Sequence, residues 1–275
     1  MADSRTLAGS LFDYILDLCH NDPFTLHVIG SFIVVNLTYL IGNIFFVFLD
    51  FLDPDWVQPY RIQDGESKKI SFEKWIGALK LISFNMTVCT FAVAYAVYKT
   101  GLISDSRELP SLFTVIFQLF IFTLIEEVNF YYGHRLFHHP RLYKYVHKVH
   151  HEFTAPVSIT SVYAHPVEHV MANVTPLFMG PMIFGSHIMV CWAWIVFSLY
   201  SKIAIHSGYH LPFTPSPEHH DYHHLSYSEN YGILGILDKL HGTSKTFDSS
   251  VRATRHRTTF TLEPVKVTFP DKKDK

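Results

Sequence analysis

The sequence predicts an all-α integral membrane protein: a helical bundle of about four spans with a cytosolic, histidine-rich lobe that holds two metal ions. Three observations lead to this fold class. Long apolar runs recur along the 275 residues. Hydrophobic residues make up 48% of the chain and charged residues only 17%, against about 25% charged residues in soluble domains. Of the 19 histidines, 15 lie between positions 134 and 224.

The first two spans are predicted from uninterrupted apolar runs. His27–Leu49 has no charged residue from position 28 onward, and a membrane-spanning helix needs about 20 apolar residues. A polar stretch containing Pro54, Pro59 and Gly65 follows and breaks the helical pattern. The second span is Trp75–Tyr98, which contains one lysine near its start.

The remaining apolar segments flank the histidines. Ser111–Ile125 is a third run and ends at Glu126 and Glu127, just before the first histidine cluster. Asn173–Ile205 is interrupted by prolines and glycines, and Lys202 is its single charge. We interpret this last run as two segments that form a hairpin entering the bilayer and returning. No span is predicted after it.

Basic residues predict the orientation. If the histidine clusters are cytosolic, only Arg5, Lys99 and Arg107 lie outside the cytosol, and 19 of the 22 Lys and Arg residues lie inside. Membrane proteins favour this distribution. Lys272 and Lys273, third and fourth from the last residue, resemble a cytosolic dilysine retrieval signal of the endoplasmic reticulum.

Composition also limits the function classes. The formal net charge of −2 gives no reason to expect a nucleic-acid partner. Cys19, Cys89 and Cys191 show no CxxC spacing, so neither a zinc finger nor a disulfide framework is expected.

Three histidine clusters are the candidate metal site. Within each cluster two histidines stand four positions apart, which places their rings on one face of a helix. Neutral imidazole binds transition metals, and so many donors in a short span indicate two ions held close together. The ligands predicted from the clusters are His134, His138, His147, His150, His151, His220, His223 and His224.

Other polar residues are secondary candidates. His206 and His210 form a further pair at the end of the last apolar run. His139 and His219 each stand next to a histidine that already satisfies the spacing of its cluster. Residues expected to support the ligands through hydrogen bonds are Glu126, Glu127, His165, Glu168, His169 and Asp221. For Glu126 and Glu127 an ordinary interfacial carboxylate is the alternative. Packing or ordinary polar roles are expected for His20, His27, His187, His241 and His256.

The metal is predicted from the ligands and their surroundings. Many imidazoles with few carboxylates suit iron, zinc or copper. A membrane location with an apolar substrate points to iron and dioxygen, because two irons can share the electrons needed to split the O–O bond. The oxidant that results can attack an unactivated C–H bond, which no side-chain acid or base can do.

The boxes HRLFHH, HKVHH and HHDYHH resemble those of the fatty acid hydroxylase superfamily, over about residues 126–243. The stretches YKYVHKVHHEFTAP, YAHPVEH, HSGYHLPFTPSPEHHDYHH and YGILGILDKLHGT are most similar to its sterol C4-methyl oxidase branch, especially to the fatty acid hydroxylase domain-containing proteins. In such relatives the second histidine of the first box stands at i+4 or i+5, so His138 and His139 are alternatives. His206 and His210 match extra ligand positions of some relatives.

The resemblance implies a di-iron oxygenase of the endoplasmic reticulum membrane that takes electrons from NAD(P)H through a reductase and cytochrome b5. It implies three parts: a membrane segment with two spans (1–110), a catalytic domain (111–250) and a cytosolic tail (251–275). The leading expectation is hydroxylation of the C4-methyl group of a 4-methylsterol in sterol biosynthesis. Two alternatives are a fatty acyl or sphingolipid hydroxylase and a non-catalytic membrane metal-binding protein.

Overall fold

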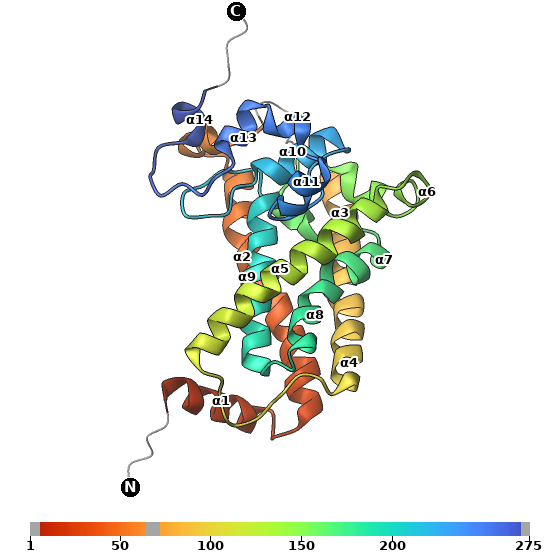
Figure 1. Ribbon diagram of the computed structural model, residues 1–275, viewed down its shortest axis with the longest axis vertical. Coiled ribbons are helices and arrows are strands. Elements are labelled where there is room, and N and C mark those ends of the chain that lie inside the picture. Colours follow the sequence, from red (N-terminus) through yellow and green to blue (C-terminus); the bar gives the residue numbers. More distant parts are fainter. Residues whose placement is uncertain (1–5, 64–71, 271–275) are drawn as a thin grey trace, which may run out of the picture.

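The computed structural model describes residues 6–63 and 72–270, and that part of the chain is built from helices (Figure 1). Within these residues the β contacts are two isolated bridges, Arg61 with Tyr209 and Ser104 with His187. The predicted all-α fold class is confirmed. The predicted retrieval signal at Lys272 and Lys273 lies outside the described residues.

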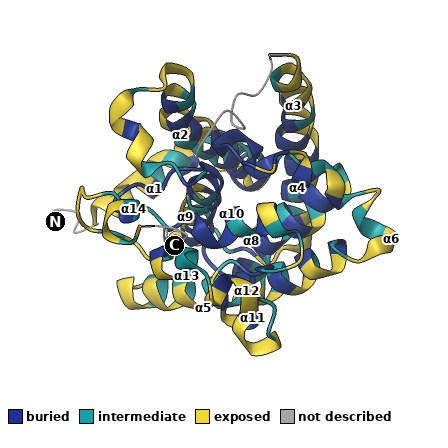
Figure 2. Ribbon diagram, turned by 90° about the horizontal axis from the view of Figure 1, so that it is seen from above, coloured by how far each residue is buried: buried dark blue, intermediate teal, exposed yellow. Residues whose placement is uncertain are grey.

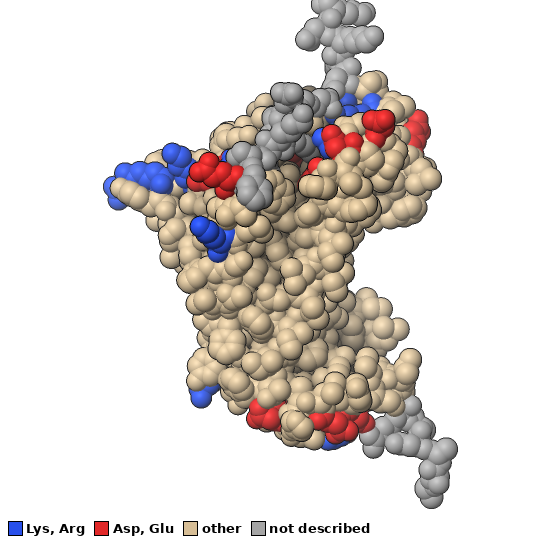
Figure 3. Space-filling model, turned by 180° about the vertical axis from the view of Figure 1, so that it is seen from behind, with Lys and Arg blue, Asp and Glu red and all other residues tan. Residues whose placement is uncertain are grey.

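Four helices are long and apolar enough to cross a membrane, as predicted. Large apolar side chains such as Leu40, Ile41 and Ile44 remain 57–66% exposed on the first of them. Figure 3 shows charged side chains at the two ends of the molecule and an uncharged belt between them. The four are Thr25–Leu52 (η1, Thr25–Gly30, with α2, Ser31–Leu52), Glu73–Thr100 (α3, Phe72–Phe84; η4, Asn85–Cys89; α4, Thr90–Thr100), α5 (Leu112–Phe137) and α9 (Ile188–His206).

The third helix is longer than its apolar run. The apolar run ends at Ile125, and α5 continues to Phe137, so the same helix carries the start of the first histidine box. The side chains of Glu126 and Glu127, which lie within the helix, are both buried.

The last apolar run is two helices, as predicted. α8 (Thr175–Ile183) has nine residues and α9 has 19, so α9 alone reaches the length of a span. Between them Gly185 adopts a φ of +56°, a conformation that glycine allows at little cost. The prolines and glycines of the sequence thus mark a real turn.

Close helix contacts bring the ends of α5 and α9 together. α2 packs along α9, and α5 packs along α8. Gly42 and Gly180 permit these approaches, since an added Cβ would lie 2.8 Å from Ile203 Cδ1 and 2.6 Å from Phe122 Cδ1, respectively. Small residues at such positions let membrane helices approach closely.

A lobe of short helices covers that end of the bundle (Figure 1). Seen from above, buried residues gather around α10 in the middle, and exposed residues lie toward the outside (Figure 2). An additional helix, α1 (Leu7–Leu18), lies at the opposite end near the N-terminus. The other short elements are η2 (Asp55–Tyr60), α6 (Pro140–Tyr143), η5 (His147–Glu152), η6 (Ser158–Val162), α7 (Pro166–Glu168), η7 (His169–Val174), α10 (Glu218–Ser226), α11 (Ile236–His241), α12 (Lys245–Asp248), α13 (Val251–Arg255) and α14 (Val265–Thr268).

Candidate metal centre

Four segments bring histidines together beneath the lobe. α5 supplies His134 in its last turn and His138 as its C-terminal cap. The second box is η5, a short 3₁₀ helix rather than the α-helical face that we expected, and the third box is α10. α9 ends at His206, just before Gly208, whose φ of +73° turns the chain.

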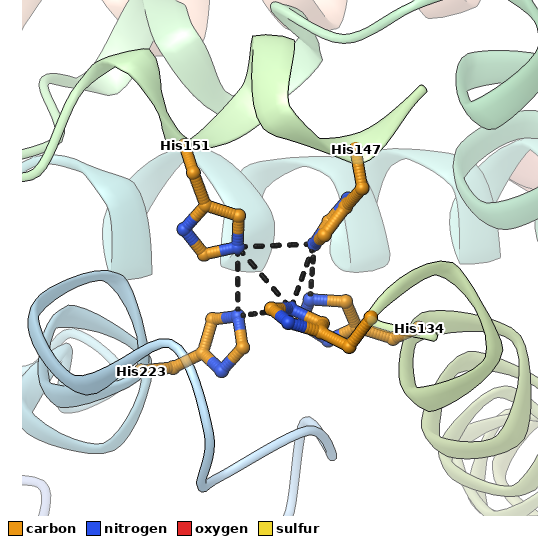
Figure 4. Close-up of side chains that lie close together, drawn as sticks. His134, His147, His151 and His223 are labelled. Carbon is orange, nitrogen blue, oxygen red and sulfur yellow. Dashed lines mark hydrogen bonds between the residues drawn. The ribbon is translucent and has the colours of Figure 1, made fainter. Parts of the chain in front are cut away.

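The first group contains five histidines. Its Nε2 atoms converge, and six pairs of them are separated by 2.9–3.2 Å. Figure 4 shows the rings of His134, His147, His151 and His223 pointing toward one another. Four rings are buried and His138 is partly buried. The members are His134, His138, His147, His151 and His223.

The second group lies beside the first and contains four buried histidines: His150, His206, His220 and His224. The Nε2 atom of His220 lies 2.9 Å from that of His206 and 3.1 Å from that of His224. In the second box the i, i+4 pair joins the first group and His150 joins the second. In the third box this assignment is reversed, because the pair joins the second group and His223 joins the first.

Hydrogen bonds at Nδ1 fix the form of four of these rings. A carbonyl oxygen only accepts, so an Nδ1 atom bonded to one carries the proton and leaves a lone pair on Nε2. The acceptors are the carbonyl oxygens of Tyr231 for His134 (2.8 Å), Tyr163 for His150 (3.0 Å), Lys202 for His206 (2.8 Å) and Glu229 for His223 (2.6 Å). His147 Nδ1 instead lies 2.8 Å from a carboxylate oxygen, Glu168 Oε1.

The converging Nε2 atoms therefore fit metal ions better than hydrogen bonds. Lone pairs facing one another at about 3 Å repel unless a cation lies between them. Imidazole nitrogens bind metals at about 2.1 Å, which places two ligands at right angles about 3.0 Å apart and two tetrahedral ligands about 3.4 Å apart. The separations of 2.9–3.2 Å correspond to the right-angle arrangement.

Burial keeps these rings in the metal-binding form. It lowers the pKa of His150 to about 4 and, with the nearby His134 and His150 rings, that of His138 to about 2. The pKa values of the other box histidines beyond the spans are lowered by the same cause: His147, His151, His220, His223 and His224. At neutral pH the rings are uncharged, and neutral imidazole is the ligand.

Two predicted ligands lie elsewhere. His139 is exposed and caps α6, where its Nδ1 accepts from the backbone N–H of Arg141. In the first box the structure thus places the i+4 histidine, His138, in the group. His210 is buried, but its Nε2 donates to the carbonyl oxygen of Arg257 and its Nδ1 faces Glu218 at 3.7 Å.

Three of the four predicted supporting carboxylates have other partners. Glu126 pairs with Lys202, and Glu127 accepts from the backbone N–H groups that precede and begin α11. Asp221 bonds to Arg252 and Gln63. A carboxylate that does contact a box imidazole is Glu168, at 2.8 Å from His147 Nδ1.

The remaining histidines lie outside both groups. His165 caps α7, and its Nδ1 accepts from the backbone N–H of Val167. His169 is buried with no hydrogen-bond partner among the described residues. His219 packs against His256, while His241 bonds to the Tyr132 hydroxyl and His187 to the Ser106 carbonyl oxygen. His27 lies 3.4 Å from Asp105.

One cavity adjoins the histidine groups, and a second shares Lys202, Ile205 and Ile233 with it. The smaller, about 20 Å³, is bounded by His134 and His147 of the first group and by His150 and His206 of the second. The larger, about 280 Å³, lies between α5, α9 and the chain around residues 256–258. Lys202 lines both. The sequence reasoning had noted this lysine only as a lone charge, although an ionisable residue in an apolar span is itself a signal of function.

Comparisons with known proteins agree with this geometry. The fatty acid hydroxylase family profile matches residues 119–243. The chain is 42% identical to human fatty acid hydroxylase domain-containing protein 2, over 79% of this chain and 66% of the relative. It is 32% identical to methylsterol monooxygenase 2-2 of Arabidopsis thaliana (83% and 89%) and 33% identical to methylsterol monooxygenase 1 of Danio rerio (80% and 78%). The chain thus spans just under two thirds of its human relative. No solved structure matches it.

Proposed function

The chain belongs to the fatty acid hydroxylase family, and on this premise we propose that it is a membrane-bound, dioxygen-dependent di-iron monooxygenase of lipids. The observation that carries the proposal is the pair of adjacent groups of Nε2 atoms, five and four, at metal-ligand separations. Iron bound there would supply the dioxygen activation needed to hydroxylate a C–H bond.

The chain's own residues would do the rest. The nine imidazoles would hold the two ions, and backbone carbonyls orient four of the rings, while the Glu168 carboxylate lies beside a fifth, His147. Burial of the rings keeps bulk water away. The small cavity, whose lining includes four of these imidazoles, would give a substrate group room beside both ions, which argues against a purely non-catalytic metal store. We assign this catalytic unit to residues 111–250.

A sterol is the proposed substrate, hydroxylated at the C4-methyl group of a 4-methylsterol. The names of two relatives that are covered over most of their length, the methylsterol monooxygenases, support this choice. The second candidate is a fatty acyl or sphingolipid chain, favoured by the name of the family profile.

We further propose that the protein resides in the endoplasmic reticulum membrane, with the histidine lobe and C-terminus in the cytosol. This orientation would place 19 of the 22 basic residues on the cytosolic side. Electrons would then come from NAD(P)H through a reductase and cytochrome b5 on the same side.

The test is turnover in a defined system. Purified protein in lipid vesicles is loaded with ferrous iron and given cytochrome b5, its reductase, NADPH and a 4-methylsterol. Formation of the hydroxymethyl sterol with uptake of dioxygen is the expected result. A fatty acyl and a sphingoid substrate are run in parallel. Oxidation of these alone would replace the sterol with the second candidate, and no oxidation of any lipid by iron-loaded protein would contradict the monooxygenase.

A further inference from the structure

A buried ion pair lies between two transmembrane helices. Lys202 Nζ of α9 is 2.8 Å from Glu126 Oε1 of α5, and the Ser198 hydroxyl lies 2.8 Å from both carboxylate oxygens. All three side chains are buried. Burying two charges within spans is costly and does not by itself stabilise a protein. The pair therefore calls for a functional explanation.

The position of this ion pair suggests a functional explanation. Lys202 lines both cavities, while Glu126 and Ser198 line the larger. The lining of the smaller cavity includes Lys202 and imidazoles of both histidine groups, together with other polar and apolar side chains. The ion pair thus lies where a molecule in the larger cavity would approach the metal ligands.

We infer that Lys202 and Glu126 bind the hydroxyl oxygen of the lipid substrate and thereby fix which carbon reaches the metal centre. This inference rests on the proposed function and deepens it. The ammonium group donates hydrogen bonds and the carboxylate accepts them, so together they match a hydroxyl, which does both. A free fatty acid is a poorer match, because its carboxylate would face Glu126.

The cavity sizes make the inference more specific. The smaller cavity, which Lys202 and the imidazoles both line, has a volume of about 20 Å³, room for little more than a water-sized group. The oxidised carbon therefore lies only a few bonds from the anchored oxygen, as a methyl group beside a ring hydroxyl does. The remainder of the lipid occupies the larger cavity, against apolar residues that include Trp194, Phe197 and Ile205.

The test compares lipids that differ only in the hydroxyl. A 4-methylsterol and its 3-deoxy analogue are titrated into the iron-loaded wild-type protein in nanodiscs, with binding measured directly and KM and kcat measured separately. We expect the wild type to favour the hydroxylated sterol on the order of 10- to 100-fold in binding, the range for a hydrogen bond to a charged group. A fatty alcohol should likewise bind more tightly than the matching fatty acid.

The variants assign the preference to the ion pair. Lys202→Met should bind both sterols equally and keep its metal. Because this change leaves Glu126 unpaired, the double variant Glu126→Gln with Lys202→Gln provides an uncharged second test and should lose the preference too. Lys80→Met, the same change at an exposed lysine of another span, is the control.

Two results would overturn the inference: a wild type that binds the deoxy sterol or the fatty acid as tightly as its hydroxylated counterpart, or a double variant that folds and keeps the preference. Failure of the proposed function would look different. In that case the wild type would bind the hydroxylated sterol selectively through Lys202 and oxidise nothing.

Discussion

His150 and His151 are neighbours in the chain, yet their Nε2 atoms join different histidine groups. Their rings lie 5.6 Å apart at an angle of 77°. His223 and His224 repeat the arrangement, 5.9 Å apart at 82°. Since η5 and α10 each contribute to both groups, the two ions would be held by shared backbone segments. Loss of one ligand should therefore disturb both sites.

Replacing one box histidine should remove metal and activity. We expect His150→Ala and His223→Ala each to bind less iron per chain than the wild type and to lose detectable lipid oxidation, because each change removes one imidazole from a group of four or five. Iron per chain is measured by elemental analysis of purified protein. His139→Ala, at an exposed position outside both groups, should retain iron. Full iron and full turnover in both test variants would show that the metal assignment is wrong.

Glu168 should tune metal affinity without binding the metal. Its Oε1 lies 2.8 Å from His147 Nδ1, and loss of such a partner typically lowers metal affinity 10- to 100-fold. Glu168→Ala should weaken iron binding within that range, and Glu168→Gln should weaken it less, since an amide oxygen still accepts. Competition with a chelator measures the affinity. An unchanged affinity in Glu168→Ala would show that the contact has no role in holding His147.

The sequence was sufficient for the fold class, and it pointed to the histidines that the structure brings together. Apolar runs predicted four spans because lipid demands long apolar helices whatever their tertiary partners. Spacing identified the box histidines because two positions four apart lie on one helical face. It could not assign His150 and His151 to different ions, since that depends on how η5 meets α9 and α10 in space.

The roles of the carboxylates were out of reach for a related reason. Glu126 and Glu127 are adjacent on α5, but one meets Lys202 and the other meets the backbone before α11, about 75 and 107 positions further along the chain. A helix directs neighbouring side chains to different faces, and only the packed structure shows what each face meets. Glu168 was among the residues expected to support the ligands, but its place in the sequence did not show that His147 is the imidazole it would contact.

The metal-free protein should lose stability in mild acid. In the unfolded chain a histidine has a pKa of about 6.5, whereas burial lowers the pKa of His150 to about 4 and that of His138 to about 2 in the fold. At pH values between the unfolded and folded pKa values, the unfolded chain binds more protons than the folded chain. The stability that the neutral histidines allow is therefore fully present above about pH 6.5, and the free energy of unfolding falls progressively as the pH drops toward 4 and below. The melting temperature of metal-free protein should drop between pH 7 and pH 5.

The control for this pH dependence is a pair of substitutions. His150→Gln should make the fall in melting temperature shallower, because one depressed pKa is removed. His139→Gln, at an exposed position, should leave it unchanged. A melting temperature that stays constant from pH 7 to pH 5 would contradict the burial of neutral imidazoles.

Glu127 should be a structural anchor rather than a ligand support. Its Oε2 accepts from the backbone N–H groups of Ile233 and Leu234 at 2.8 Å, and its Oε1 accepts from that of Leu237 at 3.2 Å. Glu127→Ala would leave these donors unpaired in a buried region, at a cost of about 1–3 kcal/mol for each unsatisfied group. We expect unfolding free energy to fall by at least about 2 kcal/mol, measured by denaturant titration in detergent. Glu127→Gln should lose less, and Glu108→Ala, at an exposed position, should lose almost nothing.

The same change should reach the metal centre through the backbone. Tyr231, two residues before Ile233, accepts the Nδ1–H of His134 with its carbonyl oxygen at 2.8 Å. When Glu127 no longer holds this segment, His134 loses part of its orientation, so iron affinity should fall in Glu127→Ala even in the fraction that remains folded. If the Glu127→Ala variant has the melting temperature and the iron affinity of the wild type, the segment is held by other contacts and Glu127 is not its anchor.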